Sequence, residues 1–531
     1  LSAFKLATAP LTVDASARYD IKGDRLDATA TIDSPEPGAL GPLAGGASWR
    51  GLRVQIKADL GSLATLPQGS VTLTGNADDV SLAAISAQIP ALGPIRLQAN
   101  LGFADGKATV QSLDFRSTPA LLNGSGSYVL ASKVGELKAT VTLPDFAVFS
   151  TLAGQPLAGQ GAWDVTATSD AKGVSLSWQG AVSDLGATGM PPQLVNASVG
   201  LSGAATWQFD QSWTLRDVRV AAADNAVLSI TGRGQVEVAD LDLSLDLPKL
   251  GWVQPDLAGG AKVSANIRQG AQGTDLRVTG EVSDLHHGPL TSRRLSLSAS
   301  LSRDPAGAIQ GTMTTNGDLI NQPLSLEGRF RYDADGLAVP TFQGKWASAV
   351  LNVVDLAITK TRRSGRAQLH IARLQDAAPL AGTDLAGSID LEMTAADIPA
   401  DSQATADPAA AGQVTVALQG KGLRSGATSI ASLDLKGTVK DPLNAALTDA
   451  TLTANGMGGA ADINRVSMTA NGNRKGLVVA LQATGARTNA DIRGKVEPDG
   501  SDILISLSRL DGRHSGIPVA LTAPTRVRIA G

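Results

Sequence analysis

The segment DLDLSLDL, at residues 240–247, decides the fold class because leucine occupies every second position. Its apolar residues are Leu241, Leu243, Leu245 and Leu247, and the positions between them hold aspartate or serine. Successive side chains of a β-strand point to opposite faces, so the segment predicts a strand with one apolar face and one wet face. Strands of this kind are typical of antiparallel sheets, which face water on one side.

The same alternation recurs along the whole chain. Further apolar residues that share a strand face are Leu52, Val54 and Ile56 in GLRVQIKAD (51–59), then Val263 and Ile267, then Leu295 and Leu297. Glycine-containing turn signals such as YDIKGDR (19–25) and VEPDGSD (496–502) follow at intervals of roughly ten residues, which predicts about 40 strands. Helical periodicity is confined to short stretches, so we predict an all-β protein with few short helices.

The composition favours a long aliphatic surface over a few densely packed cores. Hydrophobic residues make up 43% of the 531 residues, but aromatic residues only 3%. Dense cores use large rings to fill space, so the roughly three or four globular domains that this length suggests are not expected. The net charge of −4 gives no basic excess, which excludes a general nucleic-acid footprint. The absence of cysteine excludes a disulfide framework, a thiolate metal site and a cysteine nucleophile.

A phrase containing Leu-Ala-Gly marks a long internal repeat. Its glycines are Gly45, Gly159, Gly259 and Gly387, at intervals of 114, 100 and 128 residues. Each time a strand ends, a short helical turn or loop follows, then the phrase, then a new alternating strand. Repeats of this kind stack into one elongated object. We therefore predict a single repeat-built domain over 1–531, with loose units at 1–44, 45–158, 159–258, 259–386 and 387–531.

The chain carries no recognisable catalytic or metal-binding motif. His286 and His287 are adjacent, and neighbours on a strand point to opposite faces, so they do not easily share an ion. The acidic pair Asp240 and Asp242 shares a strand face, as solvated carboxylates commonly do. We therefore predict no catalytic residue, no metal site, no cofactor and no enzymatic activity.

The apolar face needs a cover, since some 40 strands would expose more apolar surface than a soluble monomer leaves in water. It can pack on a second sheet, close as a barrel in lipid, or hold an apolar ligand. A membrane barrel should show aromatic girdles, which 3% aromatic residues do not favour. Small residues at inward positions, such as Ala58, Ala265 and Ala299, favour an open groove for a flexible apolar ligand.

Three phrases carry a family resemblance: LAGQPLAGQGAWDVTA (152–167), PLAGTDLAGSIDLEMTA (379–395) and GIPVALTAPTRVRIAG (516–531). Together with the alternating strands, they resemble the periplasmic region of the TamB family, which belongs to the AsmA-like, bridge-like lipid transfer proteins. The resemblance extends over essentially the whole chain. It consists of the alternating pattern and of short, loosely similar phrases.

The resemblance implies a long, twisted, U-shaped (taco-like) antiparallel β-sheet with a continuous hydrophobic groove that conducts phospholipids between the inner and outer membranes. It also implies a periplasmic location, an N-terminal inner-membrane helix that these 531 residues do not include, and a C-terminal domain, likewise outside them, that engages a TamA-like outer-membrane barrel. The family has no catalytic residues, so only groove-lining positions carry over. The alternation assigns them to Leu52, Val54, Ile56, Leu241, Leu243, Leu245, Val263, Ile267, Leu295 and Leu297.

Two other functions are compatible with parts of the pattern. An assembly chaperone for outer-membrane proteins would use the same fold and offer sheet edges for strand addition. A secreted β-solenoid adhesin would instead require stacked parallel coils of even length and no bound lipid.

Overall fold

A computed structural model of the chain describes residues 3–8, 10–36, 47–81, 91–188, 195, 197–399, 412–459, 462–499 and 502–529. The chain divides into two units. Unit 1 comprises Leu1–Pro255 and Ala261–Gly270, and unit 2 comprises Asp256–Gly260 and Ala271–Gly531. Because strand β17 (Ala258–Gly270) crosses this division, its residues from Ala261 on are described with unit 1.

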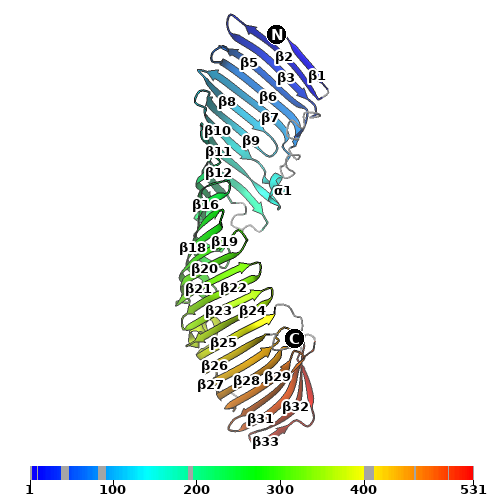
Figure 1. Ribbon diagram of the computed structural model, residues 1–531, viewed down its shortest axis with the longest axis vertical. Helices are drawn as coiled ribbons and strands as arrows, with labels where there is room; N and C mark the ends of the chain where they lie inside the picture. The colour runs from blue at the N-terminus through cyan, green and yellow to red at the C-terminus, as the bar shows by residue number, and fades with distance from the viewer. Residues whose placement is uncertain are drawn as a thin grey trace. The chain divides into compact units, whose positions relative to one another are not determined.

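Unit 1 is a run of strands that follow one another along the chain (Figure 1). Besides β17, these are β1 (Phe4–Thr8), β2 (Leu11–Asp20), β3 (Arg25–Ser34), β4 (Ser48–Arg50), β5 (Leu52–Gly61), β6 (Gln68–Ser81), β7 (Gly93–Ala104), β8 (Lys107–Arg116), β9 (Leu121–Val129), β10 (Val134–Leu143), β11 (Leu157–Ser169), β12 (Gly173–Ala187), β13 (Val199–Gln208), β14 (Trp213–Ala221), β15 (Val227–Gln235) and β16 (Val238–Leu247).

Unit 2 continues in the same manner. Its strands are β18 (Gly273–His287), β19 (Leu290–Arg303), β20 (Ile309–Leu319), β21 (Gln322–Asp333), β22 (Gly336–Trp346), β23 (Ala349–Thr359), β24 (Arg362–Ile371), β25 (Leu385–Pro399), β26 (Gln413–Ser425), β27 (Thr428–Lys440), β28 (Leu447–Gly458), β29 (Arg465–Asn473), β30 (Gly476–Thr484), β31 (Thr488–Asp499), β32 (Asp502–His514), β33 (Ile517–Ala520) and β34 (Thr525–Ile529).

Apart from β4 and β34, strands that are neighbours in sequence are neighbours in the sheet of each unit, and every strand pair in the described residues is antiparallel. Both β33 and β34 pair with β32. The short β4 is an addition to this meander, pairing with the end of β6 while β5 follows β3 directly. Neither run closes on itself, since β1 pairs only with β2 among the described residues. The predicted all-β, antiparallel class is confirmed, and the parallel coils that a solenoid requires are contradicted by these registers.

The described residues contain 34 strands, fewer than the turn spacing predicts. Strands reach 15 residues in β12, β18 and β25. They are this long because glycine and aspartate positions that resemble turns are β-bulges, through which the strand continues.

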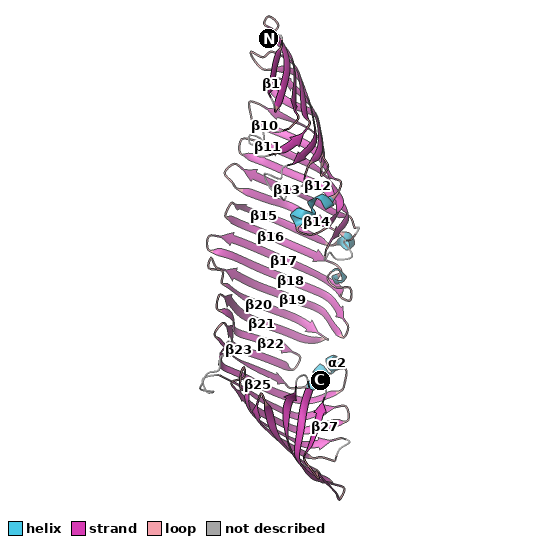
Figure 2. Cartoon of the chain, turned by 90° about the vertical axis from the view of Figure 1, so that its right-hand side faces the viewer, coloured by secondary structure: helices cyan, strands magenta, loops and turns pink. Residues whose placement is uncertain are grey.

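Helix is scarce, and it lies at strand ends (Figure 2). The short helices are η2 (Phe146–Phe149), α1 (Ser150–Ala153), η3 (Ala223–Asn225) and η4 (Leu250–Trp252) in unit 1, and η5 (Leu374–Ala377) and α2 (Ala378–Ala381) in unit 2. Within the described ranges, no helix has the length and apolar character needed to span a membrane.

The two long edges of each sheet differ in their connections. In a meander, alternate connections share an edge, so the helix-bearing connections β10–β11, β14–β15 and β16–β17 lie together in unit 1. The same reasoning puts β24–β25 on the corresponding edge of unit 2. We call this the helix edge. The opposite edge, which carries the short turns β2–β3, β7–β8, β11–β12 and β21–β22, is called the hairpin edge.

The Leu-Ala-Gly repeat has a structural cause. Gly159, Gly259 and Gly387 have φ of 125°, 113° and 105°, values that only glycine adopts without strain. Opposite Gly159, two residues of β12, Asp184 and Leu185, fit into the space of one, which is a β-bulge. Gly387 faces Gly422 and Leu423 in the same way. A Cβ on Gly159 would lie 2.9 Å from the carbonyl oxygen of Ser183.

The three described copies each follow a short helix, which agrees with the predicted order of elements. Each repeat also includes a position outside the Leu-Ala-Gly phrase, on the strand that follows the strand of the glycine. Asp184 and Asp284 each follow their glycine by 25 residues and both have positive φ. Gly45 lies outside the described residues, and the predicted repeat-unit boundaries remain a prediction.

Each sheet is a single layer. Among the described residues the buried hydrophobic side chains are few and mostly small: Ala77, Ala99, Ala139, Val182, Val199, Ala226, Leu250, Trp252, Ala261, Ile398, Ala454, Ala470 and Ala483. The chain exposes 30951 Å² of surface, whereas a compact protein of this mass exposes about 18,000 Å². The described residues therefore place no second layer over the strand faces.

Hydrogen bonds attach the η5–α2 segment to the helix edge of unit 2. The Asp376 carboxylate accepts from the Ser348 backbone N–H at 3.1 Å, and the Ser348 hydroxyl donates to the Arg373 carbonyl at 3.1 Å. Hydrogen bonding by Ser348, supported by the charge of Arg373, holds the pKa of Asp376 below its ordinary value of 3.8.

This attachment should weaken in acid. A depressed carboxyl pKa contributes stability that is fully present above the unfolded value and is lost as the pH falls through the folded value. We expect amide hydrogen exchange of residues 374–381 to speed up below about pH 4 relative to the exchange of β23. Asp376→Asn should remove most of that pH dependence, and an unchanged pH profile in this variant would contradict the assignment.

Candidate functional site: the apolar face

Cross-strand registers align the apolar residues of unit 1 into rows that run from strand to strand. One row crosses β1 to β17 with an apolar residue or glycine at each step. It consists of Leu6, Val13, Ile32, Val54, Gly75, Leu97, Phe115, Leu122, Val141, Trp163, Gly180, Leu201, Val220, Leu228, Leu245 and Val263. We call the side of the sheet that carries this row the apolar face.

Unit 2 has an apolar face of the same kind. Its central row is interrupted only by Thr315. It runs through Gly280, Leu297, Thr315, Leu326, Gly344, Leu351, Leu369, Leu391, Leu418, Leu435, Leu452, Met468, Leu481, Ile492 and Leu510.

The opposite side of the unit 1 sheet, the polar face, is polar at every step of its matching row. That row is Lys5, Asp14, Thr31, Gln55, Thr74, Gln98, Asp114, Asn123, Thr140, Asp164, Gln179, Ser202, Arg219, Ser229, Ser244 and Ser264. Water satisfies these groups, so the polar face needs no cover, and the apolar face is the side that lacks a partner.

The residues predicted to line a groove all lie on the apolar faces. In unit 1, Leu241 pairs with Ile267, and Leu245 with Val263. The others of that unit are Leu52, Val54, Ile56 and Leu243, all half-buried. In unit 2, Leu295 is half-buried and Leu297 is 38% exposed. Their contact with lipid remains a prediction.

In six cross-strand pairs of the apolar faces an aromatic ring lies against a glycine, a feature that the alternation does not reveal. The cross-strand pairs are Tyr128–Gly135, Trp163–Gly180, Trp178–Gly203, Trp213–Gly234, Phe330–Gly311 and Phe342–Gly328. A Cβ on Gly203 would lie 2.6 Å from the Trp178 ring, so the ring occupies the space that the glycine leaves free. These six rings therefore lie against the backbone of the neighbouring strand.

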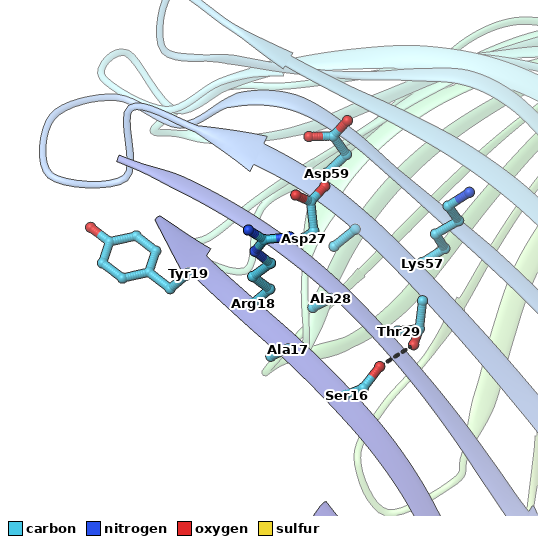
Figure 3. Close-up of a pocket in the computed structure, with 10 residues that line it drawn as sticks. Ser16, Ala17, Arg18, Tyr19, Asp27, Ala28, Thr29, Lys57 and Asp59 are labelled. Atoms are coloured by element: carbon cyan, nitrogen blue, oxygen red, sulfur yellow. Dashed lines mark hydrogen bonds between the residues drawn. The ribbon is translucent and has the colours of Figure 1, made fainter. Parts of the chain in front are cut away.

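Two hollows lie on the polar faces of the described residues. The first, of about 730 Å³, is bordered by Ser16, Arg18, Asp27, Thr29, Lys57 and Asp59 (Figure 3). In unit 2, a hollow of about 370 Å³ contains His370, whose Nδ1 lies 2.5 Å from Asp390 Oδ1. Both are lined by exposed side chains that bond with one another, as in the Ser16–Thr29 pair at 2.8 Å, and such mutual satisfaction is what a solvated strand face shows.

The acidic pair Asp240 and Asp242 is held by one amide. Asn266 Nδ2 donates to both carboxylates, at 3.0 and 2.8 Å. This hydrogen bond lowers the pKa of Asp240, with Arg268 and Arg233 adding to the effect. The described residues contain no group of three or more histidine, aspartate or glutamate side chains able to hold a metal ion. The arrangement suits strand pairing rather than proton transfer.

Each unit therefore presents rows of apolar residues that the other described residues of that unit leave largely uncovered. No protein-family model matches the chain, and a search of curated proteins finds no match.

Proposed function

We propose that this chain binds glycerophospholipids through their acyl chains along its apolar faces and conducts them between the inner and outer membranes. In this proposal it is the periplasmic part of an envelope protein of the TamB type, anchored in the inner membrane and working with a TamA-like outer-membrane barrel. The role is passive, without a catalytic residue or a cofactor.

One observation carries the proposal: nine consecutive strands of unit 2 contribute an uninterrupted apolar row to a single-layer sheet. The row is Leu351, Leu369, Leu391, Leu418, Leu435, Leu452, Met468, Leu481 and Ile492. Each methylene removed from water contributes about 0.8 kcal/mol. Neighbouring strands offer nearly the same surface, so a chain can move from one to the next without losing that contribution.

The aromatic–glycine pairs of the apolar faces favour a flexible lipid over a folded partner. Protein interfaces gain their stability from side chains that fill pockets on the other side. Here six aromatic rings lie over glycine, as Trp178 does over Gly203, which reduces the number of side chains that project to fit such pockets. Acyl chains are flexible, so they can bind a surface that has no complementary pockets.

Strand addition to a client protein is a second candidate. In the described part of the chain, β1 pairs on one side only, and Phe4 and Leu6 on it are 47% and 41% exposed. A chaperone of this kind would bind unfolded barrel strands through backbone hydrogen bonds and would not need rows of apolar residues across the whole sheet.

The test is the lipid content of the purified chain. We expect phospholipids to co-purify when the chain is prepared without detergent from cells that contain both membranes, with more than one lipid per chain by native mass spectrometry. A soluble all-β protein prepared in parallel serves as the control for phospholipid that is carried over without specific binding. Folded chain free of phospholipid, as judged by circular dichroism and lipid extraction, would move the assignment to the chaperone.

A further inference from the structure

The apolar face of unit 1 is covered at one edge of the sheet and exposed at the other. At the helix edge the buried side chains gather: Ser34, Ala77, Ser117, Val182, Val199, Ala226, Leu250, Trp252 and Ala261. Phe146 of η2 stacks on Trp163 of the apolar face, with ring centroids 6.5 Å apart. Lys249, which precedes η4, and Asp224 of η3 pair at 2.5 Å. Helices and side-chain bonds therefore cover this margin of the face.

The hairpin edge of unit 1 is open. Of the large hydrophobic residues that are exposed in the described part of unit 1, most lie at this edge: Tyr19, Ile21, Leu66, Tyr128, Leu130, Val134, Val174, Trp207, Phe209, Val236 and Val238. Among the described residues of the helix edge, the exposed ones are Leu152, Val195 and Val253, which belong to helices or connections rather than to the face. An open apolar margin next to water is the place where a bound amphiphile would keep its polar end.

The outermost row of the apolar face at this edge is rich in aromatic residues. It includes Tyr19, Phe103, Tyr128, Trp207 and Trp213, joined in register by small or aliphatic residues. The third tyrosine of the protein, Tyr332, has the equivalent position in unit 2, beside the β21–β22 turn. The three tyrosines are 47%, 39% and 54% exposed.

Tyrosine and tryptophan favour the boundary between headgroups and acyl chains, because their rings are apolar and their polar atoms reach water. Tyr19 shows this arrangement, since its Oη donates to Asp24 Oδ1 at 2.7 Å at the β2–β3 turn. That hydrogen bond raises the pKa of Tyr19, so the phenol stays protonated. Figure 3 shows the Tyr19 ring pointing away from Lys57 and Asp59 of the polar face.

Charged side chains of both signs lie along the same edge, where Asp20, Asp105 and Asp170 each precede a lysine by two residues. Lysines lie in or beside four of its turns, and no salt bridge is described for any of them. They are Lys22, Lys107, Lys133 and Lys172. Ammonium groups next to an aromatic row complement the phosphate of a lipid headgroup, as they do at membrane surfaces.

The width of the face fits one layer of acyl chains. On β3 the apolar residues Leu26, Ala28, Ala30 and Ile32 span three two-residue steps, about 20 Å. Half of a bilayer's hydrocarbon core is about 15 Å thick. An acyl chain that lies along the strands therefore fits within the width of the face.

We infer that bound phospholipids lie along the strands, with their headgroups at the hairpin edge, among the tyrosines, tryptophans and turn lysines, and their chain ends toward the helix edge. The inference rests on the proposed function and adds an orientation to it. Lipids then move sideways from strand to strand with their headgroups in water throughout.

Cysteine labelling tests this orientation directly, because the chain has no cysteine of its own. Three single variants carry an environment-sensitive bimane label: Phe209→Cys at the hairpin edge, Leu243→Cys in the middle of the face, and Leu152→Cys on α1 at the helix edge. Each is mixed with phosphatidylcholine that is spin-labelled either on the headgroup or near the methyl end of one chain, and fluorescence quenching is measured.

We expect the headgroup spin label to quench Phe209→Cys several-fold more strongly than Leu152→Cys, and the chain-end label to show the opposite order. Equal quenching at both edges, or headgroup quenching that is stronger at Leu152→Cys, would overturn the orientation while leaving lipid binding intact. No quenching by either lipid at any of the three sites, in folded variants, would overturn the proposed function itself.

Discussion

Leu243→Asp is expected to stop lipid from passing the middle of unit 1. Leu243 pairs with Ile230 on one side and Ala265 on the other, so a carboxylate there would stand within an apolar row. A charge in contact with hydrocarbon costs about 3 kcal/mol, which corresponds to roughly a 100-fold lower occupancy of that strand by an acyl chain. The measurement is transfer of fluorescent phospholipid between donor and acceptor vesicles by the purified chain, together with its co-purified lipid.

The matched control variant changes the next residue in the sequence. Ser244→Asp places the same charge on the exposed polar face of β16, opposite Ser229 and Ser264, and should leave transfer unchanged. Leu452→Asp and Thr451→Asp form an equivalent pair on β28 of unit 2, since Leu452 belongs to the apolar row and Thr451 is exposed on the other face. If Leu243→Asp and Ser244→Asp behave alike while both remain folded, lipid does not travel on the apolar face.

Gly259→Ala and Gly387→Ala should each destabilise unit 2 by about 2–4 kcal/mol. A Cβ on Gly259 would lie 2.5 Å from the Ser283 carbonyl oxygen and 2.6 Å from that of Asp284. On Gly387 it would lie 2.6 Å from two carbonyl oxygens of β26. Both glycines also have a positive φ that an alanine adopts only with strain, so the strands must separate at the bulge.

Thermal unfolding followed by circular dichroism measures the effect. Gly437→Ala serves as the control, because Gly437 lies within β27, has no left-handed φ, and its added Cβ would meet only ordinary contacts at 3.6 and 3.9 Å. That control should change stability by no more than about 0.5 kcal/mol. Equal melting temperatures for Gly259→Ala and Gly437→Ala would mean that the repeat glycine is not required by the bulge.

Much of the fold is readable from local pattern. Alternation in a segment such as 240–247 predicts a half-buried strand because the two-residue period of a strand is local. The Leu-Ala-Gly phrase marks the bulges because the backbone there accepts glycine alone. The position outside the phrase, held by Asp184 and Asp284, is missed because aspartate is one of several residues that tolerate a positive φ.

The aromatic–glycine pairs could not be predicted, because nothing local links Trp178 to Gly203 or Tyr128 to Gly135. Glycines inside alternating strands are the one available signal, since glycine in a strand interior often marks a close approach. Which aromatic residue approaches depends on register, and register depends on turn lengths and bulges along the intervening chain.

The amino-acid sequence by itself determined that this protein is all-β, that one side of each strand is apolar, and that glycine recurs at the bulges, because each of these properties follows from neighbouring residues. Only the tertiary structure decided that the apolar residues join into rows from strand to strand, that six aromatic rings lie over glycine, and that one edge of unit 1 is covered while the other is open. These properties belong to pairs of strands, and they arise where register and connection length bring distant residues together.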